Sequence, residues 1–438
     1  MELDPVLLSR VQWGWVIGWH ILLPAFTVGL ASYIAVLEAF YFFTGREIWF
    51  RISGFWTRIF AVSFGMGVVS GIIMPFQFGT NWSRFTDATA DVISPLLAYE
   101  GLMAFFLEAS FLGVLLFGRR LVPAWAHFFA ALMVAFGTLL SSFWILATNS
   151  WMQTPAGYKL ADGRFEPVDW FAIVFSPSFP YRFLHNVTAF YITTAFVVMG
   201  VAAWLLRRGR ATEDARMMIR MALDLLIILV PLQMVLGDQH GLNTLEYQPA
   251  KLAAIEGRYD TAGPAPLTLF GIPDDAAATM RYAIEIPDLG SIVLTHSWNG
   301  AVKGLKEWPL DQRPPVGPPF FAFRIMVGIG FIMLLVVVVG QWLQLRRPAV
   351  GRRLVPAALP MDSAARFHCR HCRLDDHGGR PSALDGVWAV AHRGFSLAVA
   401  DRSERGSVAC SLCRRLFDHV SHRHRLHGRL GAPRSAGA

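Results

Sequence analysis

A few ionisable residues inside the long apolar stretches of this sequence are candidates for function, because a charge is costly there and is usually kept for function. They are His20, Glu100, Glu108, His185 and Arg324. Met326 stands two residues after the arginine and adds a soft sulfur ligand. A His/Met pair is one of the axial sets that hold six-coordinate haem iron, and a lone His with an open sixth position suits oxygen chemistry.

Each of these residues also has a purely structural interpretation. A lone His on an apolar helix is more often a hydrogen-bonded packing residue, and a single Met is usually core filler. Glu100 and Glu108 would serve as a polar clamp between helices. Taken together, these residues favour a functional role, because two His, one Met and two carboxylates are expected at similar depth in the membrane. Carboxylates eight residues apart lie about two helical turns apart and are placed to pass protons along a helix.

The composition predicts the elements that position these residues. The chain of 438 residues is 54% hydrophobic and 16% charged, with a mean hydropathy of +0.43, whereas soluble domains carry about 25% charged residues. We therefore predict an all-α, polytopic transmembrane helix bundle. Seven apolar segments are each near the roughly 20 residues that span a bilayer. They run approximately over residues 15–43, 55–78, 95–117, 124–147, 183–206, 219–237 and 320–343.

The loops between the segments alternate in charge. Four short loops are rich in Arg, namely 44–51, 118–121, 207–220 and 344–353. Basic residues in short loops stay on the cytoplasmic side. We therefore expect the N-terminus and the long loop 238–319 to lie on the outer side. A connector of that length is usually functional or disordered.

Several long motifs resemble subunit I of the cytochrome bd quinol oxidases over about residues 5–347. The motifs are Phe76–Trp82, Glu100–Glu108, Trp144–Gln153, Lys251–Glu256, Phe270–Pro273 and Phe321–Met326. The resemblance implies the haem-binding subunit of a respiratory terminal oxidase in the bacterial inner (cytoplasmic) membrane, with a periplasmic N-terminus. Such an enzyme oxidises quinol at the outer face, reduces oxygen to water and supports electrogenic aerobic electron transport.

The resemblance also implies roles for particular residues. His185 and Met326 match the axial ligands of the low-spin haem b558. His20 matches the ligand of one of two high-spin haems, b595 or d. Glu100 and Glu108 match acids near the high-spin pair that serve haem binding and proton delivery. Electrons from quinol are then expected to reach the high-spin pair through haem b558.

The outer loop carries the residues that match the quinol site, so it corresponds to the family's Q-loop. Lys251 and Glu256 match residues of quinol oxidation, and Arg324 is expected to neutralise a haem propionate. The Q-loop is short, since 309–319 stands where some members carry a long insertion, and this resembles the cyanide-insensitive type. The implied partners are subunit II, a small single-span subunit, quinol, oxygen and membrane lipid, without nucleic acid.

A different class of function remains open from the residues alone. A proton-coupled transporter or channel would also bury acids such as Glu100 and Glu108. The haem content of the purified protein separates this alternative from the oxidase.

The end of the chain has a different composition from the rest. Residues 1–350 contain 24 basic and 24 acidic residues, whereas 351–438 contain 15 Arg and 7 acids, all four Cys and eight of the thirteen His. The net charge of +8 therefore belongs to the tail. Its Cys pairs suggest a zinc or nucleic-acid module as a third interpretation, although 37 residues between the pairs is long for a zinc ribbon. The pairs are Cys369/Cys372 and Cys410/Cys413.

A frameshift explains the tail better. The resemblance implies two further transmembrane helices and a Glu haem ligand before a Gly-Arg-Gln-Pro-Trp motif, and neither follows residue 347. Codons for Leu374–Leu384, read one base later, permit Trp-Thr-Thr-Thr-Glu-Val-Gly-Arg-Gln-Pro-Trp. We hypothesise a frameshift near 348–360, so that 1–347 is the oxidase region and 348–438 an out-of-frame, disordered tail. Such a chain is expected to keep haem b558 and to have an impaired high-spin pair.

Overall fold

Long helices make up most of the computed structural model, which describes residues 5–346, all within one compact unit of the chain. Seven helical stretches in this part are long and apolar enough to cross a membrane, so all seven predicted segments are confirmed. They are α1 (Pro5–Thr44), α2 (Glu47–Gly79), the stretch from α3 (Ser83–Tyr99) through η1 (Glu100–Phe105), α4 (Phe106–Phe117) and η2 (Gly118–Arg120), then α5 (Ala124–Gln153), α7 (Phe179–Arg207), α8 (Thr212–Tyr247) and α11 (Gly317–Arg346).

The third stretch differs from the prediction, because the apolar segment 95–117 is only the second half of it. Its helix changes at Glu100 to a π turn that ends at Phe105. A π turn inside an α-helix is rare and frequently marks a functional site.

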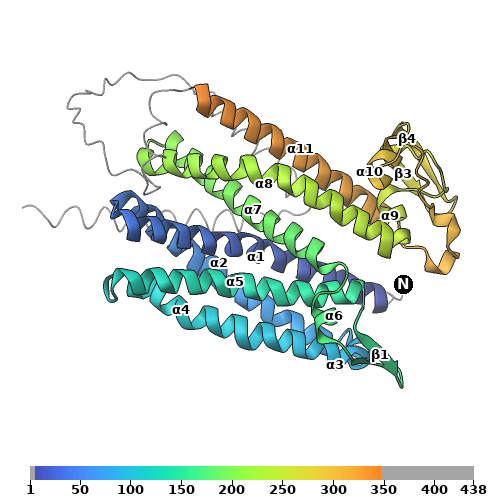
Figure 1. Cartoon of the computed structure of the whole chain (residues 1–438), viewed down its shortest axis with the longest axis horizontal. Coiled ribbons are helices and arrows are strands. Elements are labelled where there is room, and N and C mark those ends of the chain that lie inside the picture. The colour runs from blue at the N-terminus through green and yellow to red at the C-terminus, as the bar shows by residue number, and fades with distance from the viewer. Residues whose placement is uncertain (1–4, 347–438) are drawn as a thin grey trace, which may run out of the picture. The chain divides into compact units, whose positions relative to one another are not determined.

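Short elements gather at one end of the bundle, which we call the long-loop end. They are β1 (Tyr158–Ala161), β2 (Arg164–Pro167), α6 (Trp170–Val174), α9 (Pro249–Glu256), β3 (Leu267–Asp274), β4 (Thr279–Ile286), α10 (Leu289–Thr295), η3 (Leu305–Glu307) and η4 (Leu310–Gln312). Figure 1 shows α6, β1, α9, α10, β3 and β4 at the same end as the start of α1. The predicted alternation of loops is thereby confirmed, while the side of the membrane stays a prediction.

The two hairpins are the departure from an all-α chain. Strands β1 and β2 pair antiparallel, as do β3 and β4. Inside the hydrocarbon of a membrane, every backbone N–H and C=O must be hydrogen-bonded within a helix or a closed barrel. The loops lie outside the hydrocarbon, so they can contain strands. Helices and strands cover much of the loop 238–319, and its first ten residues, 238–247, belong to α8.

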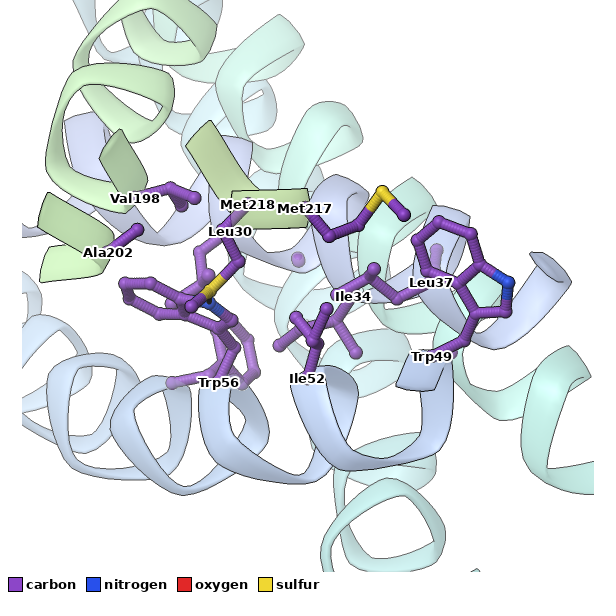
Figure 2. Close-up of a cluster of buried hydrophobic side chains, with 14 of the residues drawn as sticks. Leu30, Ile34, Leu37, Trp49, Ile52, Trp56, Val198, Ala202, Met217 and Met218 are labelled. Atoms are coloured by element: carbon purple, nitrogen blue, oxygen red, sulfur yellow. Dashed lines mark hydrogen bonds between the residues drawn. The ribbon is translucent and has the colours of Figure 1, made fainter. Parts of the chain in front are cut away.

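The apolar core lies between α1, α2, α7 and α8. Leu30, Ile34 and Leu37 are spaced on one face of α1 and are fully buried. Figure 2 shows them beside Trp56 of α2 and Met218 of α8, together with Val198 and Ala202 of α7. The indole Nε1 of Trp56 lies 3.1 Å from the Met218 sulfur. This core fixes the four helices relative to one another and so positions the polar residues on them.

A buried ionic cluster lies near the other ends of these helices and was not among the residues singled out from the sequence. The carboxylate of Glu38 accepts hydrogen bonds from Arg119 and Ser53. Its second oxygen lies 3.1 Å from His127 Nδ1, while His127 Nε2 lies 3.1 Å from the carbonyl of Leu115. The cluster ties α1, α2, η2 and α5 together, and both Glu38 and His127 are almost fully buried.

Candidate functional site

His185 lies on α7, six residues after the helix begins at the long-loop end, and its ring faces α8. The side-chain amide nitrogen of Gln233 lies 3.2 and 3.1 Å from the two ring nitrogens. A Cβ built on Gly237 would lie 3.4 Å from His185 Cε1, so the backbone of α8 comes close to the ring at this glycine. The ring therefore packs between a neutral amide and a glycine of α8.

Met326 lies on α11, nine residues after its start at the long-loop end, and the residue is 50% exposed. At about 1.5 Å per residue, His185 and Met326 lie roughly 9 and 14 Å inside their helix ends. Helices α7 and α11 both pack against α8. The two ligand candidates thus lie at similar depth on helices that flank the same neighbour.

His20 lies on α1 and faces α2. Its Nδ1 is 2.9 Å from Ser70 Oγ, and that hydroxyl donates in turn to the carbonyl of Gly67 at 2.9 Å. Because the Ser70 proton is used there, its oxygen accepts from His20 Nδ1–H, and Nε2 keeps the lone pair. A ring held through Nδ1 with a free Nε2 is the usual arrangement of a metal-binding His. Gly71 lies directly against the ring, since a Cβ there would meet His20 Cε1 at 3.1 Å.

Glu100 and Glu108 are joined by the π turn. Glu100 opens it and accepts a hydrogen bond from Ser141 of α5 at 3.0 Å. Glu108 is almost fully buried on α4, close enough to Glu100 for their charges to interact. A π turn rotates the chain less per residue than an α turn, so it shifts Glu108 towards the side of Glu100. The shared role of these two acids stays a prediction.

Lys251 lies on α9 and reaches the end of α5. Its Nζ donates to Gln153 Oε1 at 3.1 Å and to Gln248 Oε1 at 3.2 Å. Burial, together with the charge of Arg182, lowers the pKa of Lys251 to about 8. The ammonium is thus held by neutral amide oxygens and is poised to titrate near neutral pH.

Glu256 ends the same helix but points to a different partner. Its carboxylate accepts from Arg324 Nη2 at 3.1 Å, and only 4% of the residue is exposed. Burial raises the pKa of Glu256, and the charges of Arg324 and Arg258 oppose that shift. The structure therefore pairs Glu256 with Arg324 and leaves Lys251 with amides.

Arg324 is held by the long loop through most of its donors. Besides Glu256, its guanidinium donates to the carbonyl of Thr268 at 3.1 and 2.7 Å and to the carbonyl of Ile255. This fixes the start of α11 against α9 and β3. The expected role of Arg324 at a haem propionate stays a prediction.

Two further polar residues near His185 were missed from the sequence. The His240 ring centroid lies 5.8 Å from that of His185, and Arg182 lies one turn before His185 on α7. His240 was overlooked because α8 continues past 237, where the apolar segment was expected to end. Arg182 could have been found from the sequence, because it is a basic residue three positions before the candidate ligand His185.

Comparison with known proteins gives the family. The family model described as cytochrome bd terminal oxidase subunit I matches residues 8–368, and so extends into the region assigned to the tail, which lies outside the described residues. The chain is 36% identical over 328 residues to cytochrome bd-II ubiquinol oxidase subunit 1 of Escherichia coli (strain K12), covering 74% of this chain. That match spans 63% of the relative, which is less than two thirds of its length.

Two further matches cover more of the related protein. Cytochrome bd ubiquinol oxidase subunit 1 of Bacillus subtilis (strain 168) is 33% identical over 355 residues, covering 79% of this chain and 76% of the relative. The structure of bd oxidase from Geobacillus thermodenitrificans superimposes with a TM-score of 0.71 at 33% identity, covering 77% of each chain. Since the family model matches well over half of the residues of this chain, the chain belongs to the cytochrome bd terminal oxidase subunit I family.

Proposed function

We propose that this chain is the haem-binding subunit of a membrane quinol oxidase that oxidises quinol at the long-loop end and reduces oxygen to water. The observation that carries the proposal is the arrangement of His185 and Met326. They lie at similar depth on α7 and α11, and the Lys251 and Glu256 groups of α9 lie at the same end of the bundle. Membership of the family does not favour a transporter or channel.

The residues fit the cofactors that this family implies. His185 and Met326 would hold a low-spin haem, b558, and His20 would hold one of the high-spin haems, b595 or d. Haem iron supplies the one-electron redox chemistry that quinol oxidation and oxygen reduction require. The Ser70 hydrogen bond orients His20, and Gly237 and Gly71 keep side chains away from the two rings.

The α9 residues support oxidation of a quinol. A quinol must lose protons as well as electrons, and a buried carboxylate with a raised pKa is a better base than an exposed one. Glu256 is such a group, held in place by Arg324, so we assign it the proton-accepting role. The ammonium of Lys251 would donate to a quinol oxygen. These protons leave at the long-loop end.

Glu100 and Glu108 would hold and pass the protons used for water formation. The hydrogen bond from Ser141 to Glu100 and the π turn between Glu100 and Glu108 support this role. If these protons come from the cytoplasm while quinol protons leave outside, the reaction separates charge across the membrane.

The setting and partners follow from the same proposal. We infer a bacterial inner membrane location with a periplasmic N-terminus. The expected partners are a second integral subunit and a small single-span subunit. The relatives' names include a ubiquinol oxidase from Escherichia coli and a putative menaquinol oxidase from Bacillus subtilis, which supports a quinol as the substrate class.

The proposal is tested by purifying the protein, co-expressed with its second subunit, from membranes. We expect bound haem in a reduced-minus-oxidised spectrum and oxygen uptake driven by added quinol. A preparation that is folded and free of haem would contradict the proposal and would favour the transporter interpretation instead.

Replacing Glu256 by glutamine is expected to lower quinol oxidation by about 10²–10⁴-fold, the usual contribution of a general base. In the unmodified protein the rate should fall as pH drops through the raised pKa of Glu256, because the protonated acid cannot accept a proton. The charged groups facing it are Arg324 of α11 and Arg258, neither of which titrates in that range.

The pH profile of the rate measures this, with Glu246→Gln as the control, since Glu246 is exposed on α8. Glu256→Asp should keep an acid limb and Glu256→Gln should lose it. An unchanged acid limb in the Gln variant would exclude Glu256 as the acceptor.

A further inference from the structure

Glu38 and His127 form a buried pair that the proposed function leaves unused. Among the described residues of the membrane-spanning helices, only Glu38, Glu108 and His127 carry a carboxyl or imidazole group that is almost fully buried. A titratable group in such a position is costly and is by default a candidate for function. Glu108 has its proposed role in proton delivery, and the geometry of the other two suits the same process.

The hydrogen bonds of His127 determine how many protons the pair holds. The carbonyl oxygen of Leu115 can only accept, so His127 Nε2, which lies 3.1 Å away, carries a proton. On the other side of the ring, Nδ1 lies 3.1 Å from Glu38 Oε2, a hydrogen-bond distance that needs a hydrogen between the two atoms. One further proton is therefore shared by the ring and the carboxyl group, and it can reside on either of them.

The other carboxyl oxygen of Glu38 is held by fixed donors. Oε1 accepts hydrogen bonds from Arg119 of η2 and Ser53 of α2. The guanidinium is held in turn, because it donates to Ser53 Oγ at 2.7 Å and to the carbonyl of Phe50 at 3.1 Å. These contacts keep Oε2 directed at the imidazole of His127. Arg119 also supplies the counter-charge that a buried carboxylate needs when the shared proton leaves.

The pair lies between Glu108 and the end of the bundle opposite the long-loop end, which we call the short-loop end. Glu38 is six residues before α1 ends, and His127 is three residues after α5 begins. Leu115 follows Glu108 by seven residues on α4, so the two lie on the same face of the helix and about 10.5 Å apart along it. Helix α5 packs against both α1 and α4. The Arg119 side chain is 19% exposed and brings the cluster to the surface.

We propose that the Glu38–His127 pair takes up protons at the short-loop end and supplies them to Glu108 for water formation. The inference rests on the proposed function, in which these protons enter from the cytoplasm, the side on which Arg-rich short loops are expected. The shared proton moves from the pair to Glu108, and a proton from the cytoplasm replaces it. At the usual O···O spacing of about 2.8 Å, a chain of about three hydrogen-bonded waters would span the distance along α4.

The test compares oxygen uptake and proton uptake in the oxidase assembled with its second subunit. Glu38→Gln keeps an acceptor for Arg119 and cannot exchange the shared proton. We expect its maximal rate of oxygen uptake to fall about 10²–10⁴-fold, the usual contribution of a proton-transferring group. The KM for quinol and the haem content should stay unchanged, because quinol binds at the other end of the bundle.

Proton uptake is measured with a pH indicator after oxygen is added to the fully reduced enzyme in weakly buffered solution. It should slow by the same factor in Glu38→Gln, whereas Glu38→Asp keeps a carboxyl group and should recover part of the rate. The matched control is Asp214→Asn, because Asp214 is also an acid paired with an arginine, Arg51, near the start of α8. It should leave both rates unchanged.

A haem-loaded Glu38→Gln protein with normal proton uptake would overturn the inference. If that variant binds no haem, His127→Gln decides, and its proton uptake per haem must be slower than that of the control. If neither glutamine variant binds haem, Glu38→Asp decides by the same criterion. Failure of the proposed function would instead appear as no quinol-driven oxygen uptake in the unmodified protein.

Discussion

Replacing His185 by alanine is expected to abolish the low-spin haem signal and to reduce quinol-driven oxygen uptake by more than about 100-fold. Loss of a residue that only orients a ligand already costs roughly 10–100-fold in metal affinity or activity, and His185 is proposed as the ligand itself. Met326→Leu should act differently. It leaves His185 in place, so the haem should remain bound and change from low-spin to high-spin, because one axial ligand is lost.

The reduced-minus-oxidised spectrum and the haem-to-protein ratio measure both effects. His296→Asn is the control, since His296 is a partly exposed His that pairs with Asp238. It should keep the low-spin haem. A normal low-spin band in His185→Ala would remove the residue from the ligand set, and with it the main support for the proposed function.

The second large effect concerns the tail, which lies outside the described residues. On the frameshift hypothesis, the chain as printed is expected to show haem b558 and little or no normal haem d band, because the expected Glu ligand before Gly-Arg-Gln-Pro-Trp would be encoded in another reading frame. Shifting the frame so that 374–384 reads Trp-Thr-Thr-Thr-Glu-Val-Gly-Arg-Gln-Pro-Trp should restore the haem d band.

The same spectra distinguish the zinc interpretation. Changing Cys369 and Cys372 to serine should have no effect on haem content if the tail is out of frame. A normal haem d band from the printed chain would refute the frameshift hypothesis. So would an uninterrupted gene sequence across residues 345–380 that encodes this chain and supports full activity.

The transmembrane architecture was predictable because its cause is local. Each span is an apolar run, and a short loop rich in Arg follows every second span, starting with the first. There is a physical reason why the sequence did not predict the hairpins and the π turn. Strands β3 and β4 pair with each other, and the π turn that begins at Glu100 packs against α5, from which Ser141 donates a hydrogen bond to Glu100.

The candidate site shows the same division. Residue type and position in a span were enough to select His20, His185 and Met326 as ligand candidates. Their surroundings could not be read from the sequence, because Ser70 lies 50 residues from His20 and Gln233 lies 48 residues from His185. Arg324 is the clearest example. It was expected to face a haem propionate, and its observed partners come from a loop whose fold was not predicted.

The buried cluster around Glu38 has a consequence for biosynthesis. Its partners Arg119 and His127 are 81 and 89 residues further along the chain, so the ribosome makes Glu38 well before either. Until then the carboxylate of Glu38, six residues before the end of α1, has no basic partner, and an unpaired charge in a membrane segment is costly. The first helix should therefore stay near the translocon until α5 arrives. Slowing synthesis between residues 44 and 119 should expose the nascent chain to membrane quality-control proteases.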